Sequence, residues 1–191
     1  MKIYDISQEV FSCKVYPGDP APERQILCAI EKADLYNLTA FSMCAHNGTH
    51  IDAPFHFYGE GKTVEQMDLH RFVGDCYVAR HTGLVTSADA MAILKKAEGA
   101  LRILIAGQAT VTAEAAEVFA DAGICLLGNE SQTVGPENAP MQVHKILLKK
   151  EIVLLEGVVL ADVTEGRYFL SAAPLCLAGA DGAPCRAYLI E

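Results

Sequence analysis

The chain has 191 residues, of which 51% are hydrophobic and 20% are charged, and its formal net charge is −9. This composition is typical of a globular protein with one substantial core, and it argues against a disordered chain. No extended basic run accompanies the acidic charge, which argues against a protein that binds the backbone of nucleic acids. The mean hydropathy of +0.21 indicates apolar surface that self-association would bury.

The first third of the chain mixes short apolar runs with turn signals such as Tyr16–Pro20. Arg24–Ile30 and Leu38–Met43 have the composition of short strands. A turn at Gly59–Lys62 is followed by Val64–His70, which we expect to form a short helix.

Strands and helices then alternate along the chain, which predicts an α/β domain with some parallel strand pairing. The predicted helices, with capping and terminating residues in parentheses, are Ala88–Lys96 (Ser87, Gly99), Thr112–Ala122 (Thr112, Gly123) and Pro140–Lys150. The predicted strands are Asp75–Arg80, Leu101–Ala106, Ile124–Leu127, Ile152–Leu155, Arg167–Ser171 and Arg186–Ile190. We therefore expect a single domain over residues 1–191 with a mixed β-sheet and flanking helices.

The cysteines and the start of the chain bear on localisation. The seven cysteines form no C-x-x-C pair and their number is odd, so we expect free thiols in a reducing compartment. Met1–Asp5 has no apolar signal core, and no apolar run is long enough to cross a membrane. We expect a cytoplasmic protein without a membrane partner. Cys44 is the only cysteine near a histidine and is the one candidate for a thiol nucleophile.

The most distinctive segment is the window from His46 to His56, which contains three of the six histidines of the chain. Asp52 lies in the same window, and imidazole with carboxylate suits a divalent metal such as zinc or manganese. Gly48 and Pro54 disfavour a helix here, so we expect an extended segment. His46, His50 and Asp52 would then share one side and form an open metal site.

This window resembles the H-x-G-T-H-x-D-x-P-x-H signature of the cyclase family of metal-dependent hydrolases, which includes kynurenine formamidases and isatin hydrolases. Weaker similarities extend over nearly the whole chain. Tyr16–Asp19 resembles a W-P-G-D loop of the family, and Gly128–Ser131 resembles a G-x-D-x region. His144 resembles a later histidine, and Glu156 resembles the glutamate of an E-G segment. Asp181–Ala187 resembles a D-G-x-P-x-R-A ending. The resemblance implies a fold of the swivelling β/β/α type and an assembly as a homodimer or homotetramer.

The resemblance also implies roles for individual residues. A first metal would be held by His46, His50 and Asp52, and Asp52 would bridge to a second metal held also by His144 and Glu156. Relatives of the formamidase kind use two zinc ions and those of the isatin hydrolase kind use one manganese ion. We therefore expect one or two divalent metals per chain, zinc or manganese. His56 is expected to be the catalytic acid and base.

Three positions depart from the family pattern. Tyr16 stands where kynurenine formamidases have a tryptophan near the substrate, so we expect Tyr16 to bind substrate but with a changed specificity. Glu130 stands where the G-x-D region has aspartate, and Asn47 fills a variable position. His70 and His81 match no ligand position and are expected to be structural or solvated.

The sequence leaves three hypotheses open. The first is a hydrolase that cleaves an amide, formamide or lactam of a small molecule with a metal-activated water. The second is kynurenine formamidase itself, against which Tyr16 argues. The third is a non-catalytic metal-binding protein with the same fold. His56 argues against the third, because holding the metal does not require it and histidine exchanges protons near neutral pH.

Overall fold

Four central strands rich in buried apolar residues run parallel to one another in the computed structural model, which describes residues 1–191. Such strands are buried on both faces, which is why their sequences read as continuous apolar runs. They are β5 (Val73–Arg80), β7 (Arg102–Ala106), β9 (Leu126–Asn129) and β10 (Val153–Glu156).

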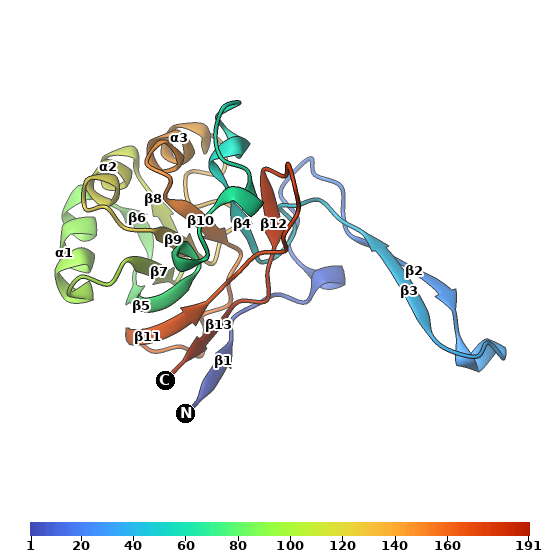
Figure 1. The fold of residues 1–191 in the computed structure, drawn as a ribbon. Helices are drawn as coiled ribbons and strands as arrows, with labels where there is room; N and C mark the ends of the chain where they lie inside the picture. The colour runs from blue at the N-terminus through green and yellow to red at the C-terminus, as the bar shows by residue number, and fades with distance from the viewer.

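Antiparallel strands extend this sheet on both sides to nine strands, in the order β1-β13-β11-β5-β7-β9-β10-β4-β12 (Figure 1). The outer strands are β1 (Ile3–Asp5), β13 (Tyr188–Ile190) and β11 (Gly166–Ser171) on one side, and β4 (His50–Asp52) and β12 (Gly182–Pro184) on the other. The chain thus has the α/β fold with a mixed sheet that the sequence predicts.

Three helices cover one face of the sheet (Figure 1). They are α1 (Ser87–Ala97), α2 (Ala113–Asp121) and α3 (Met141–Lys149). Alternation along β7 turns Ile103 and Ile105 toward the helices and Leu104 toward a second core on the opposite face. A short parallel ribbon of β6 (Gly83–Val85) and β8 (Ala109–Val111) lies beside the sheet. No helix is long and apolar enough to span a membrane.

Two local predictions are wrong. The segment Val64–His70 is not one helix but two 3₁₀ turns, because Met67 between them is extended and Asp68 caps the second turn. The first helix is capped by Thr86 rather than Ser87, because the Thr86 hydroxyl accepts from the Asp89 N–H while the Asp89 carboxylate accepts from Thr86 in return. The 3₁₀ helices are Val10–Ser12, Ile30–Lys32, Pro54–His56, Val64–Gln66 and Leu69–Arg71.

A two-stranded ribbon, β2 (Glu23–Cys28) and β3 (Leu38–Ser42), projects away from the body of the molecule (Figure 1). Its strands pair only with each other, and the turn between them carries the exposed Leu35 and Tyr36. We call residues 23–42 the arm. Its strands carry no fully buried residue, so the main body does not cover it.

Candidate metal centre

The pairing of β4 with β10 brings three polar side chains to one face of the sheet. Ile51 packs into the second core, so its neighbours His50 and Asp52 point to the opposite face, which the helices cover. Glu156 lies directly opposite His50 in the antiparallel register and therefore points the same way. All three are buried, which is why their charges need partners.

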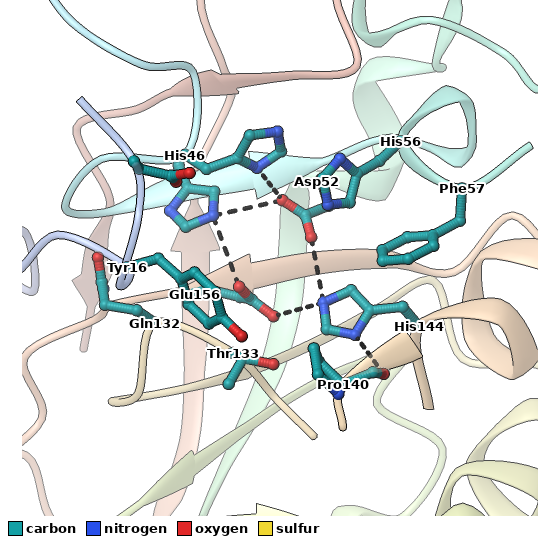
Figure 2. Close-up of a pocket in the computed structure, with 12 residues that line it drawn as sticks. Tyr16, His46, Asp52, His56, Phe57, Gln132, Thr133, Pro140, His144 and Glu156 are labelled. Carbon is teal, nitrogen blue, oxygen red and sulfur yellow. Dashed lines mark hydrogen bonds and ion pairs between the residues drawn. The ribbon is translucent and has the colours of Figure 1, made fainter. Parts of the chain in front are cut away.

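The helix α3 supplies the fourth side chain. Val143 and Leu147 pack against the sheet, and this packing turns His144 inward to the carboxylates. The His144 Nε2 atom lies 3.1 Å from Glu156 Oε1 and 3.4 Å from Asp52 Oδ2, while Nδ1 donates to the Pro140 carbonyl at 2.9 Å. Both residues that were expected only from family resemblance, His144 and Glu156, thus lie beside the histidine window (Figure 2).

His46 reaches the same cluster from a turn rather than from a strand. The extended conformation expected for the whole window holds only from His50 onward, because Gly48 has a positive φ of 64° and the Asn47 N–H donates to the Cys44 carbonyl. The turn directs His46 Nδ1 to Asp52 Oδ1 at 2.7 Å. A Cβ atom on Gly182 would lie 2.8 Å from His46 Cε1, so only glycine leaves room for this ring.

The buried carboxylates perturb the titration of all three imidazoles. Burial alone would lower the pKa of His46, but Asp52 and Asp181 outweigh it and raise this pKa to about 11. For His50 and His144, burial is likewise outweighed by Asp52 and Glu156, which raise the pKa to about 9 and about 10. Burial opposes the ionisation of Asp52, but the three histidines hold its pKa well below the usual range. The protein thus favours carboxylates that are ionised.

The donor set fits a divalent metal. The ligand atoms of His50, Asp52 and Glu156 lie within 4.8 Å of one another, and so do those of His46, Asp52 and His56. Imidazole nitrogens and carboxylate oxygens are the ligands of zinc and related divalent ions in catalytic sites. The site therefore has the chemistry of a centre for a divalent metal.

His56 lies at the open side of the cluster. Its side chain is 28% exposed, against 1% for His50 and 4% for His144. Its Nδ1 and His46 Nε2 each lie 2.9 Å from the same oxygen of Asp181. These two donors hold the pKa of Asp181 well below its usual range, although its partial burial acts in the opposite direction.

A cavity of about 220 Å³ opens over the cluster (Figure 2). Its remaining wall is formed by Tyr16, Asp19, Phe57, Gln132, Thr133 and Pro140. The Tyr16 hydroxyl donates to the Glu137 carbonyl at 2.7 Å, which fixes its ring at the wall. Gln132 Oε1 and Thr133 Oγ1 are buried and have no hydrogen-bond partner within the protein, so both can meet a polar ligand.

The other residues that the sequence singled out lie outside the cluster. Glu130 accepts from the backbone N–H groups of Gly107 and Leu160, so the longer side chain has a structural role here. His70 pairs with an exposed aspartate, and His81 Nε2 contacts the Leu84 carbonyl at 2.9 Å. The Cys44 thiol donates to Asp19 at 3.7 Å and does not line the cavity.

Sequence reasoning missed Asp181, Gln132 and Thr133. Asp181 begins the D-G-x-P-x-R-A ending, so a signal was present, but it carried no role. Gln132 and Thr133 follow Gly128–Ser131 with no pattern that distinguishes them from loop residues. Their position at the metal centre results from the fold alone.

The Cyclase family model matches residues 4–136, and the chain belongs to the cyclase family of metal-dependent hydrolases. A kynurenine formamidase from Erythrobacter litoralis is 33% identical over 204 residues, which cover 100% of this chain and 94% of the relative. Another, from Bacillus cytotoxicus, is 34% identical over 203 residues, with 97% and 95% covered. This chain is thus an enzyme that depends on a divalent metal.

Solved structures agree with this assignment. A structure described as a potential metal-dependent hydrolase with cyclase activity is 29% identical and has a TM-score of 0.83, covering 98% of this chain and 96% of its own. Isatin hydrolase A from Labrenzia aggregata shares the fold, with a TM-score of 0.84 at 18% identity and with 98% and 93% covered.

Proposed function

We propose that this enzyme cleaves a C–N bond of a small-molecule amide, formamide or lactam by adding water to the carbonyl carbon. The observation that carries the proposal is a group of three imidazoles and two carboxylates that opens on one side to the cavity, with every member but His46 buried. When bound, a divalent metal lowers the pKa of a water ligand toward neutrality and polarises the scissile carbonyl. The products are a carboxylic acid and an amine.

Two sets of ligands are proposed within the cluster. His46, His50 and Asp52 would hold one metal, and Asp52, His144 and Glu156 a second. The Asp52 carboxylate supports a bridging role, because Oδ1 faces His46 and His50 while Oδ2 faces His144. Zinc suits this nitrogen-rich set best, with manganese as the alternative.

His56 is proposed to carry the proton. It takes a proton as water adds to the carbonyl and returns one to the leaving nitrogen when the C–N bond breaks. Its position supports this role, since its side chain is 28% exposed, against 14% for His46 and 1% for His50. Gln132 and Thr133 would orient the polar atoms of the substrate, because both present buried unpaired oxygens at the cavity.

N-formylkynurenine is the first substrate to test. The full-length relatives with this activity support it, and so do the aromatic rings of Tyr16 and Phe57 at the cavity, where an aromatic substrate could stack. Tyr16 is proposed to bind substrate as an anchored wall of the cavity, since its hydroxyl is already engaged by Glu137.

A homodimer or homotetramer is proposed for the assembled enzyme, and the arm would take part in its interface. An isolated two-stranded ribbon is only marginally stable in water. The arm nevertheless exposes about half of Ile26, Leu27 and Phe41 and nearly all of Leu35, which is 96% exposed. Exposed large apolar side chains gathered on one segment are typical of interfaces.

The remaining partner and localisation proposals follow from charge and thiols. A net charge of −9 argues against nucleic acid and against anionic membrane surfaces as partners. All seven cysteines are free, which supports a reducing compartment such as the cytoplasm.

A panel of small substrates tests the proposed reaction. Metal-loaded enzyme is offered N-formylkynurenine, simple formanilides, isatin-like lactams and matched esters, and release of the acid and the amine is followed. We expect turnover of at least one C–N substrate and its loss in the His50→Ala variant. Turnover of none of them by fully metal-loaded protein would contradict the proposal.

A further inference from the structure

Asp181 joins two histidines with different proposed tasks. A single oxygen, Oδ2, lies 2.9 Å from His46 Nε2 and 2.9 Å from His56 Nδ1, and the two ring centroids are 4.2 Å apart. An ordinary ion pair of a surface carboxylate that is 42% exposed would contribute little. Two imidazoles that converge on one oxygen beside a metal centre form a more specific arrangement.

The backbone fixes this carboxylate in place. The Asp181 carbonyl accepts from the Ala53 N–H at 2.9 Å, and the preceding carbonyl of Ala180 accepts from the Val64 N–H at 2.9 Å. The next residue, Gly182, pairs with Asp52 across β12 and β4. Asp181 therefore keeps a constant register with the metal centre.

The three imidazoles that face the buried carboxylates follow one pattern. His50 and His144 each donate one N–H to a backbone carbonyl, of Gly48 and Pro140 respectively, and turn the other nitrogen to the carboxylates. His46 uses its two nitrogens the other way round, because Nε2 faces the acceptor Asp181 and Nδ1 faces Asp52. Acceptors of this kind fix the tautomer and orientation of a ligating histidine, and a charged acceptor binds more strongly than a carbonyl.

The geometry points to Asp181 as a positioning residue for both the metal centre and the proton carrier. It holds His46 with Nδ1 toward the metal ligands, and it holds His56 with Nδ1–H engaged, which leaves Nε2 for the proton exchange. The inference rests on the proposed function of the site. It adds that one carboxylate outside the ligand set fixes the spacing between the rings of His46 and His56.

Two variants of Asp181 and one matched control test this inference. Asp181→Asn keeps the size but removes the charge, and Asp181→Ala removes the acceptor. Asp68→Asn is the control, because Asp68 also pairs with a histidine, His70, at 2.9 Å, but on the surface and with no proposed role in the metal centre. Zinc affinity is measured by competition with a chromogenic chelator, and kcat and KM are measured on metal-saturated protein.

We expect Asp181→Ala to lose about 10-fold to 100-fold in zinc affinity, which is the usual effect of removing the acceptor of a ligating histidine. At saturating metal, kcat should fall by a similar factor while KM stays within about threefold. Asp181→Asn should show a smaller loss in the same direction, and Asp68→Asn should match the wild type. If the alanine variant does not fold, the zinc affinity and kcat of the asparagine variant test the inference.

Zinc affinity and kcat within about twofold of wild type in both Asp181 variants would overturn the inference. A lower melting temperature with unchanged affinity and kcat would also overturn it, because that is the result of a purely structural role. Failure of the proposed function has a different result, because the wild type itself would then bind no zinc or would bind zinc and cleave no substrate. If the wild type binds zinc but cleaves no substrate of the panel, zinc affinity alone decides on Asp181.

Discussion

The metal centre and the arm are both built from short strands next to a turn, yet the sheet buries one and leaves the other uncovered. At the centre, the three-residue strand β4 pairs with β10 on one side and with β12 on the other, so His50 and Asp52 are completely enclosed. In the arm, β2 and β3 have no third partner, and apolar side chains remain in solvent. The ligands proposed for the first region all come from one chain, whereas we propose that a second copy of the chain covers the second region.

The difference concerns energy as well as shape. Burying Asp52 and Glu156 is costly unless nearby imidazoles compensate their charge. The arm has the opposite problem, because exposed apolar side chains stabilise a protein only when another surface covers them. The predictions below test first the buried region and then the exposed one.

The largest effect is expected for His56→Ala. This variant should keep its metal but lose about 10²-fold to 10⁴-fold in kcat, because general acid–base catalysis contributes that much. Metal content and kcat are measured side by side, with His70→Ala as a control on a surface histidine. Full activity in His56→Ala would remove this residue from the proton-transfer role.

The buried histidines predict that metal affinity rises with pH. In the metal-free protein the pKa of His50 is raised to about 9 and that of His144 to about 10, so both carry protons at pH 6 to 8. A metal must displace these protons, so apparent affinity should rise about tenfold per pH unit for each proton released. Calorimetry in buffers of different ionisation enthalpy counts the protons. Metal uptake without proton release would contradict the raised pKa values of His50 and His144.

The close packing of the centre predicts an effect of Gly182→Ala. The new Cβ would lie 2.6 Å from the Ile51 carbonyl and 2.8 Å from His46 Cε1, so the His46 ring must shift. We expect metal affinity to fall about tenfold, as for other changes that disturb the orientation of a ligand. Gly59→Ala is the matched control, since a Cβ there meets no atom within 4 Å. Equal affinity in both variants would show that the ring tolerates the contact.

The smallest effect on catalysis is expected in the arm. The double variant Ile26→Asp with Leu35→Asp should shift the protein toward the monomer in light scattering, because it places charge on the proposed interface. Metal content should not change, since the centre lies within one chain. Met91→Asp, an exposed apolar residue of α1, is the control. A wild type that is already monomeric would refute the proposed role of the arm.

Much of the fold could be predicted from the sequence, because the central strands and the three helices each contain enough residues to show their periodicity. The strands β1, β6, β8 and β12 were missed, because three residues are too few to show alternation. At the site, the histidine window was evident, whereas His144 and Glu156 were expected only through family resemblance. Asp181 lies 135 residues from His46 in sequence, so only the folded chain could connect the two.

Metal content is the most direct test of the central claim, that the buried cluster is a catalytic metal centre. Protein purified without a metal-affinity tag is analysed for its elements beside His50→Ala and the surface control His70→Ala. We predict about one to two equivalents of zinc or manganese per chain in the wild type and the control, and loss of this metal in His50→Ala. No metal in the wild type after reconstitution, or equal metal in His50→Ala, would contradict the account.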